Sequence, residues 1–206
     1  VAGVAAGRWS WTDPATTYYR LRYGTSRRMH GHQDRGALVW STRGVPVLVD
    51  AQTYGNDVNL PDAAWCRTPA AHNTQVPRGR TLDLNAPVAL TRATRSGSAH
   101  AYTLADRLYG QNHVRTWVID NARHAVRLTD TTPSAATTLL HLDPGWRLSS
   151  VARDRTSVIL VNGPRRLRVA ATGTFTVLRG SRRPIAGWVY PSAGTRVAAV
   201  QLVIAT

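Results

Sequence analysis

The stretch SVILVNGPRRLRVA, residues 157–170, decides the fold class of this chain. Its first half, Ser157–Val161, is rich in aliphatic and β-branched residues, which favour strands. Its second half, Arg165–Ala170, alternates basic and apolar residues, as a half-buried strand does. The pair Asn162-Gly163 between the halves is typical of a tight hairpin turn. The stretch therefore predicts two antiparallel strands.

The same pattern of short apolar runs separated by turn residues recurs along the chain, as a meander from about residue 98 onward. Short strands at this spacing predict an all-β protein, an antiparallel β-sandwich of many short strands. Residues 1–35 are expected to be a lead-in with one extended stretch, and residues 51–71 a long loop without a helix. The further predicted strands are Tyr18–Tyr23, Ala37–Thr42, Val45–Val49, His113–Ile119, His124–Thr129, Thr174–Leu178, Ile185–Tyr190 and Val197–Ile204.

The composition limits the classes of partner. The chain has 26 basic and 11 acidic residues in 206, a formal net charge of +15, and its basic residues are all arginine. This charge favours anionic partners, although an arginine-biased genome would produce it equally well. No long basic run or aromatic-studded motif is present, so nucleic acid is not an expected partner. No apolar run is long enough for a membrane span, and the single cysteine, Cys66, excludes an intrachain disulfide.

Met29-His30-Gly31-His32-Gln33-Asp34 is the segment of greatest chemical interest. In an extended backbone, residues at alternate positions share one face, so two imidazoles and a carboxylate point the same way. Two further polar residues stand out, because Asp50 closes an apolar strand and His72 follows the long loop. Histidine nitrogen and carboxylate oxygen are ligands that Zn²⁺ takes in proteins. The segment therefore predicts a metal site with several candidate ligands.

His32, Asp50 and His72 are the preferred ligand set, because they arrive from separate segments and so can converge on one ion. Burying Asp50 at the end of an apolar strand is costly unless the carboxylate is paired or metal-bound. Asp34 would then accept the second N–H of a ligand histidine. Two alternatives stay open. His30, His32 and Asp34 form a second set if their strand bends, and a hydrogen-bonded polar cluster without metal is the third interpretation. The other four histidines, His100, His113, His124 and His141, are expected to be surface or core residues.

Several segments together resemble the C-terminal β-sandwich domain of the heparinase II/III-like polysaccharide lyases. Their order, their strand context and the His-Asn-Thr triplet all fit this domain. The resemblance is clear over about residues 18–78 and looser to about residue 150. The segments that carry it are His30–Asp34, the strand pair that ends at Asp50, Thr53-Tyr54, Arg67-Thr68, Ala71–Thr74 and, later, Leu139–Pro144.

The resemblance implies roles for particular residues. It makes His32, Asp50 and His72 the ligands of a metal, usually zinc, which is the set also preferred from the residues themselves. It places His30 toward the substrate cleft and Arg67 close to the same site.

The chain departs from the family next to Arg67. Family members commonly have a tyrosine there, whereas this chain has Trp65 and Cys66, so Tyr54 is the nearer phenol. We therefore expect His30, Arg67 and Tyr54 to be catalytic residues, and Asn73 and Trp65 to be substrate contacts. The structural alternatives are a salt bridge from Arg67 to Asp62 or Asp57, a hydrogen bond from His30 to the surroundings of the metal, and packing of Tyr54 and Trp65 under the loop.

The resemblance also implies a missing part. These lyases normally begin with an α/α-toroid that supplies most catalytic groups, and 206 residues of strand-like sequence cannot build it. The chain begins with Val1 rather than methionine. We therefore expect residues 1–206 to be a single domain from the C-terminal part of a longer, secreted or periplasmic protein.

Three functions are compatible with these expectations. The first is a zinc-containing component of a lyase that cleaves an acidic, uronic-acid polysaccharide, such as a glycosaminoglycan or alginate, by β-elimination. The second is a metal-stabilised module that binds an acidic glycan without chemistry. The third is a zinc-dependent hydrolase with an open coordination position.

Overall fold

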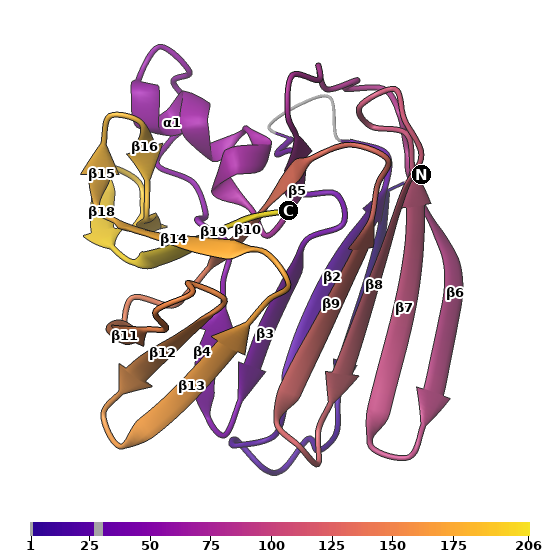
Figure 1. Cartoon of the computed structure of the whole chain (residues 1–206), viewed down its shortest axis with the longest axis vertical. Helices are drawn as coiled ribbons and strands as arrows, with labels where there is room; N and C mark the ends of the chain where they lie inside the picture. The colour runs from indigo at the N-terminus through magenta and orange to yellow at the C-terminus, as the bar shows by residue number, and fades with distance from the viewer. Residues whose placement is uncertain (1, 27–30) are drawn as a thin grey trace.

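The computed structural model describes residues 2–26 and 31–206, and it confirms the predicted antiparallel β-sandwich (Figure 1). An eight-stranded sheet has the order β4-β3-β2-β6-β7-β8-β9, with β1 paired to β2 off this path. A four-stranded sheet, β14-β19-β10-β5, and a three-stranded sheet, β11-β12-β13, form the opposing layer. Two small ribbons, β15-β16 and β17-β18, complete the strands. No helix in the described residues is both long and apolar enough to cross a membrane.

The elements are short, and most of them are strands. Their bounds are β1 Ala2–Arg8, β2 Tyr18–Gly24, β3 Leu38–Thr42, β4 Val45–Leu48, α1 Pro61–Cys66, the 3₁₀-helix η1 Pro69–Ala71, β5 Gln75–Pro77, β6 Val88–Ser96, β7 Ala99–Asp106, β8 His113–Asp120, β9 Ala125–Thr131, β10 Ala136–His141, β11 Arg147–Val151, β12 Ser157–Asn162, β13 Arg165–Ala170, β14 Thr174–Arg179, β15 Ser181–Arg182, β16 Ile185–Ala186, β17 Trp188–Ser192, β18 Thr195–Ala198 and β19 Val200–Ala205.

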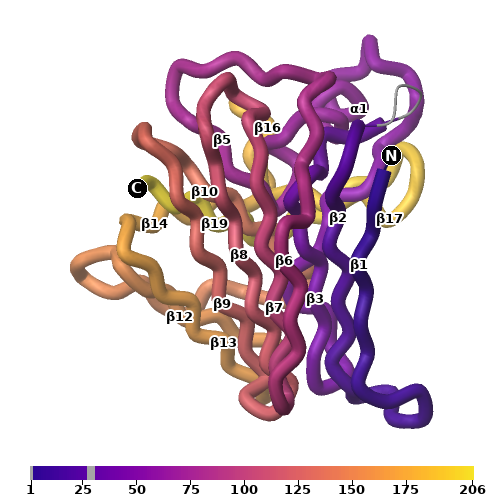
Figure 2. The backbone as a smooth tube through the Cα atoms, turned by 90° about the vertical axis from the view of Figure 1, so that its right-hand side faces the viewer, coloured from indigo at the N-terminus to yellow at the C-terminus, as the bar shows by residue number. Residues whose placement is uncertain are grey.

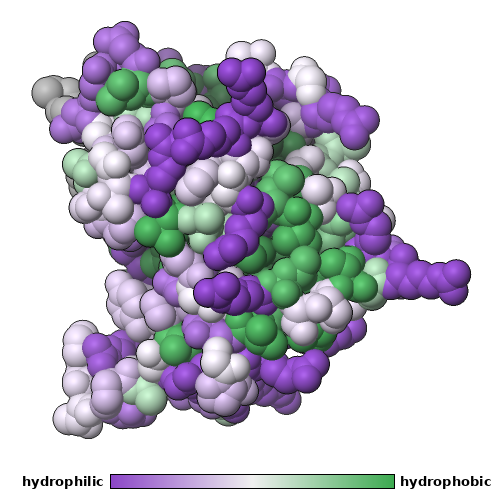
Figure 3. Space-filling view, turned by 90° about the vertical axis from the view of Figure 1, so that its left-hand side faces the viewer, coloured by the Kyte–Doolittle hydropathy of each residue, from purple (hydrophilic) through white to green (hydrophobic). Residues whose placement is uncertain are grey.

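The main hydrophobic core lies between the two layers. The eight-stranded sheet contributes Leu21, Leu38 and Trp117, and the opposing strands contribute Leu160 and Leu202, all buried in one cluster. Burial of such side chains contributes roughly 1.5–3 kcal/mol each, so this layer contact supplies most of the stability of the sandwich. Figure 3 shows that, on the side formed by α1 and the later strands, areas of hydrophobic surface remain between projecting hydrophilic side chains.

The predicted hairpins are confirmed, with small shifts at their ends. Strands β12 and β13 pair from Ser157↔Ala170 to Asn162↔Arg165, as the opening stretch predicted. Strands β3 and β4 pair around the turn at Arg43-Gly44, and β8 pairs with β9. The predicted strand Ile185–Tyr190 is instead divided into β16 and β17 at Gly187, whose φ of +67° suits glycine. The meander also begins earlier than expected, at β6.

The lead-in expected over residues 1–35 contains a full strand that the sequence did not reveal. Strand β1 pairs with β2 from Ala2↔Gly24 to Arg8↔Tyr18, at the side of the sheet seen in Figure 2. A Cβ atom at Gly3 would lie 2.3 Å from the ring of Tyr23, and one at Gly7 would lie 2.4 Å from the ring of Tyr19, so these glycines make room for the rings. Glycine has low strand propensity, which is why the alternation test missed this strand.

The expectation of a helix-free loop over residues 51–71 is wrong. It contains α1 and η1, and both begin with a proline at the first turn, where its fixed φ suits a helix. Trp65, Cys66 and Ala71 from these turns are buried in a second small cluster with Ala51 and Tyr190. Six residues give too short a pattern for helical periodicity to be recognised, and tertiary burial stabilises the helix instead.

Candidate metal centre

Three segments that lie far apart in sequence meet beside α1 and η1. His32 precedes β3, Asp50 follows β4, and His72 ends η1. Their candidate ligand atoms all lie within 4.8 Å of one another. In the described part of the chain, no other three side chains of these types bring ligand atoms together in this way. The structure thus brings together the set preferred from the sequence.

Backbone hydrogen bonds hold each of the three segments in place. The N–H of Gln33, next to His32, donates to the carbonyl of Arg67 at 3.1 Å, and Ala51 N–H donates to Ala71 O at 3.3 Å. Val49 N–H donates to His141 O at 2.9 Å, which ties the Asp50 segment to β10. Because strand and loop carbonyls fix both neighbours of Asp50, the carboxylate is positioned before any ligand binds.

Asp50 and His72 form a close ion pair. His72 Nδ1 lies 2.9 Å from Asp50 Oδ2, and Asp50 Oδ1 accepts a hydrogen bond from Gln52 N–H at 2.9 Å. Burial opposes the charge on Asp50, but the charge and hydrogen bond of His72 outweigh it and lower the pKa of Asp50 to about 2. Burial likewise opposes the charge on His72, and Asp50 raises the pKa of His72 above its usual value. Each partner stabilises the ionised form of the other.

His32 lies on the more exposed side of the cluster. Its ring centroid is 5.3 Å from that of His72, and its Nε2 is 3.2 Å from Thr53 Oγ1. Burial and the nearby charge of His72 lower the pKa of His32, so this imidazole is neutral at neutral pH. A neutral imidazole has a free lone pair, which is the form that ligates a metal.

The donors fit a zinc ion. Two imidazoles and one carboxylate are a common zinc set, and three protein ligands leave a fourth position open. His72 is fully buried, and its Nε2 is one of the few buried side-chain atoms in residues 2–26 and 31–206 that have no hydrogen-bond partner. An unsatisfied buried polar atom destabilises the fold. A metal ion bound to this nitrogen would remove that cost.

The other residues of the histidine segment are placed less directly. His30 lies outside the described residues. Asp34 is expected to accept an N–H from a ligand histidine, but its side chain pairs with Arg22, whose Nε lies 3.8 Å from Asp34 Oδ1. The negative charge of Asp34 nevertheless helps to raise the pKa of His72, so it acts on the cluster electrostatically.

Arg67 and Tyr54 both lie near the cluster. Arg67 Nη2 donates to Asn56 O at 3.2 Å rather than to Asp57 or Asp62, the salt-bridge partners considered for it. Its positive charge contributes to the lowered pKa of His32. Tyr54 packs edge-on against Tyr190 with ring centroids 5.4 Å apart.

Trp65 and Asn73 are both buried. The indole of Trp65 is 9% exposed and lies edge-on to Tyr190 and His141, which favours the packing alternative over sugar stacking. Asn73 Nδ2 donates to Leu38 O and Val49 O, and Asn73 Oδ1 accepts from His141 N–H at 2.6 Å. Both amide hydrogens are therefore used inside the protein, and Asn73 holds the strands that flank the metal cluster.

Sequence reasoning missed two groups beside the site. His141 is a buried core residue, one of the two positions expected for it, but its place next to Trp65 and the site was not predicted; burial and His72 lower its pKa to about 4. Arg196 lies over the rings of Tyr54 and Trp188, at 5.5 and 5.6 Å, and pairs with Asp62 at 3.3 Å. Arg196 is more than 120 positions from the cluster in sequence, so no local motif could connect it.

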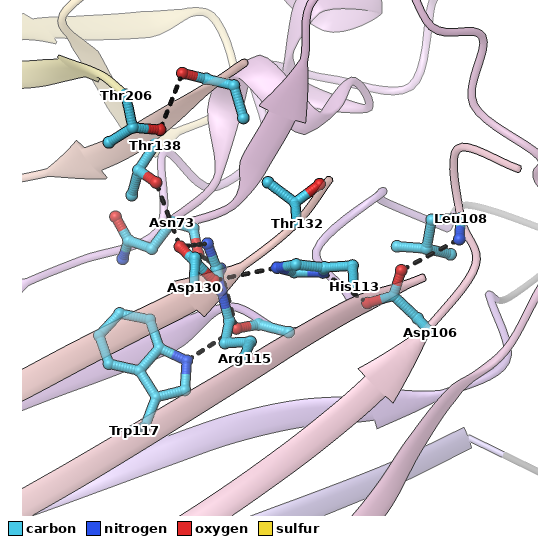
Figure 4. Close-up of polar contacts among 12 residues, drawn as sticks. Asn73, Asp106, Leu108, His113, Arg115, Trp117, Asp130, Thr132, Thr138 and Thr206 are labelled. Atoms are coloured by element: carbon cyan, nitrogen blue, oxygen red, sulfur yellow. Dashed lines mark hydrogen bonds and ion pairs between the residues drawn. The ribbon is translucent and has the colours of Figure 1, made fainter. Parts of the chain in front are cut away.

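The back of the site connects to a second polar cluster through Asn73 (Figure 4). Arg115 Nη1 donates to Asn73 O at 2.8 Å, and the same guanidinium binds both carboxylate oxygens of Asp130 at 2.7 and 2.9 Å. His113 lies between Asp106 and Asp130, at 2.8 and 3.0 Å. This second cluster is described below as the ionic cluster.

The chain was compared with known protein families and structures. The family model described as heparinase II/III-like, C-terminal, matches residues 3–206. A heparinase III, the BT4657 gene product, superposes with a TM-score of 0.81 at 14% identity, covering 99% of this chain and 32% of that one. A mutant of the heparan sulfate lyase HepC from Pedobacter heparinus superposes with a TM-score of 0.82 at 13% identity, with the same coverage. The chain thus spans about a third of the length of these structures. No curated protein matches it.

Proposed function

Because the chain belongs to the family of heparinase II/III-like C-terminal domains, we propose that it is the sandwich part of a polysaccharide lyase and holds Zn²⁺ at His32, Asp50 and His72. The proposal rests chiefly on the convergence of these three side chains from separate segments. A second support is the net charge of +15, which suits an acidic polysaccharide. We also propose that the protein acts outside the cytoplasm, where such polymers occur.

The proposed reaction is β-elimination at a uronic acid. A base removes the proton on C5, next to the carboxylate, the C4–O bond breaks, and an acid protonates the departing glycosidic oxygen. The developing enolate-like charge must be neutralised by cations or strong donors. Arg67 would contribute to this, because its guanidinium pairs well with a carboxylate.

The proton-transfer groups proposed are His30 and Tyr54. Imidazole titrates near neutral pH, so His30 suits transfer in either direction. The phenol of Tyr54 can donate or accept a proton, and its ring lies under the guanidinium of Arg196. When bound, zinc supplies a fixed positive charge and a rigid anchor for the loop before Asn73. The remaining catalytic groups would come from the toroid expected elsewhere in the protein.

Absorbance measurements on the full-length protein test this proposal. Elimination creates a C4–C5 double bond, so ultraviolet absorbance should rise with heparan sulfate or alginate as substrate. Tyr54→Phe should lower the rate at least tenfold, whereas Tyr18→Phe, at an exposed strand position, should not. New reducing ends without absorbance would instead identify a hydrolase and contradict the proposal.

A non-catalytic glycan-binding module is the second candidate. It is favoured by the net charge of +15, which would hold an acidic glycan whether or not chemistry follows. In that case the protein would be retained on immobilised heparin or alginate, with a salt-dependent affinity, and would release no product.

A further inference from the structure

A groove separates two strand edges on the side of the sandwich opposite β1. It has a volume of about 1620 Å³, and its lining includes most of β9 and of β13. Strand β9 pairs only with β8, and β13 only with β12, within the described residues. Each strand therefore presents one row of backbone N–H and C=O groups without a strand partner, which is the arrangement that accepts an added strand.

Along both edge strands, half-buried apolar side chains alternate with exposed side chains. Val126 and Leu128 of β9, and Leu167 and Val169 of β13, are half-buried and pack against the main core. The residues between them point to the opposite face and are exposed. In this exposed set, Arg127, Arg166 and Arg168 are basic and make no ion pair within residues 2–26 and 31–206. Both walls are thus apolar inward and basic outward.

The floor of the groove contains polar atoms that lack a partner. Trp40 and Gln75 both line it and are 4% and 7% exposed. Trp40 Nε1 and Gln75 Oε1 are buried and have no hydrogen-bond partner in the described part of the chain. One is a donor and the other an acceptor, and leaving either unsatisfied costs about 1–3 kcal/mol. The floor of the groove thus contains one donor and one acceptor that the described residues leave unsatisfied.

We propose that the groove binds an extended segment of a partner polypeptide in which acidic and apolar side chains alternate. A strand added beside β9 would direct every second side chain inward, toward Leu128 and Leu167, and the others outward, beside Arg127. The volume exceeds the roughly 300–1,000 Å³ of pockets for small ligands, which suits a polypeptide segment. A second copy of this chain is disfavoured, because its corresponding edges carry the same positive charge.

The test uses fluorescence anisotropy with the full-length protein and a labelled eight-residue peptide in which aspartate alternates with valine and leucine. A peptide of the same composition, with its four aspartates in one block, is the control. The alternating peptide should bind at least tenfold more tightly, and N-methylation of alternate amides should remove that advantage. Equal binding of the two peptides would overturn the proposal.

Charge reversal on the protein provides the matched comparison. Arg127→Glu should weaken binding of the alternating peptide at least tenfold, whereas Arg92→Glu, exposed on the same sheet but outside the groove, should leave it unchanged. An equal loss of peptide affinity in Arg92→Glu would show that only the overall charge of the protein matters, and it would overturn the proposal. Two other outcomes would also overturn it: displacement of the peptide by a heparin oligosaccharide that binds more tightly, and a dimer that Arg127→Glu dissociates.

Discussion

The candidate metal centre and the ionic cluster are two histidine–aspartate arrangements in one sandwich, and their charges are balanced in different ways. In the ionic cluster, His113 lies between Asp106 and Asp130, and Arg115 supplies a permanent positive charge to Asp130. In the metal centre, Asp50 has only His72 as an ionic partner, and His72 Nε2 has no hydrogen-bond partner in the described residues. In the ionic cluster, an arginine of the protein balances the buried carboxylate. The candidate metal centre has no such arginine in the described residues, and its features suit a bound metal ion instead.

Electrostatics support the same distinction. Burial opposes ionisation of Asp130, but Arg115 and His113 outweigh it and lower the pKa of Asp130 far below its usual range. The pKa of Asp50 is lowered to about 2 chiefly by His72, with smaller contributions from the Gln52 N–H and from His141. A histidine partner loses its charge as the pH rises, whereas an arginine does not. The negative charge of Asp50 in the candidate metal centre is therefore balanced less strongly by protein side chains than that of Asp130 in the ionic cluster.

The largest expected effect is the loss of Arg115. Arg115→Met should lower the free energy of unfolding by about 3–5 kcal/mol, because the carboxylate of Asp130 would stay buried without its main counter-charge. Urea denaturation measures this effect, with Arg92→Met as the exposed control, expected within about 0.5 kcal/mol of wild type. A fall of less than 1 kcal/mol in the free energy of unfolding would show that Arg115 is not the main counter-charge of Asp130.

Removal of a metal ligand is the next largest effect. His72→Ala should weaken Zn²⁺ binding by more than about 100-fold, or roughly 2.7 kcal/mol, because one of three protein ligands is lost. Competition with a chromophoric chelator measures the affinity. His113→Ala is the matched control, since it removes a histidine from the ionic cluster instead. An equal fall in zinc affinity in both variants would show that zinc binding does not depend specifically on His72.

Chelation should destabilise only a protein whose metal centre is intact. Removing zinc from wild type should lower the melting temperature by several degrees, since a ligand at 100 times its Kd stabilises a fold by about 2.7 kcal/mol. The His72→Ala variant should melt at the same temperature with and without chelator. A wild-type protein indifferent to chelator, with no zinc by elemental analysis, would contradict the metal proposal.

The smallest effect concerns the pH dependence of the ionic cluster. Burial lowers the pKa of His113, but hydrogen bonds to Asp106 and Asp130 together raise it above its value in the unfolded chain. Protonated His113 therefore stabilises the fold below the unfolded pKa of about 6.5, and this contribution is lost as the pH rises through the folded pKa. The melting temperatures of wild type and His113→Gln should converge as the pH rises from 6 to 9, measured with zinc in excess so that metal-bound His72 stays neutral. A gap that stayed constant over this range would show that His113 does not titrate in this way.

The sequence predicted the fold class because local pattern carries it. Alternation and the turn at Asn162-Gly163 predicted the β12–β13 hairpin, since both signals lie within a few neighbouring residues. Strand β1 and helix α1 were missed, because their stability comes from what covers them. The rings of Tyr19 and Tyr23 fill the space over Gly7 and Gly3, and Tyr190 and Ala51 pack against α1.

The candidate ligands followed from residue chemistry together with the family resemblance, and tertiary pairing decided the rest. The sequence set His72 apart from His113 by its place after the long loop and in the His-Asn-Thr triplet, but it did not show which charged groups surround either ring. The difference arises because β8 and β9 place Arg115 opposite Asp130, whereas the end of β4 and η1 place Asp50 against His72 with no arginine paired to it in the described structure. By itself the sequence determined a basic β-sandwich and a set of candidate metal ligands among its histidines and aspartates. Strand pairing alone decided which carboxylates have their charge balanced by an arginine, because pairing brings together side chains that lie far apart in the sequence.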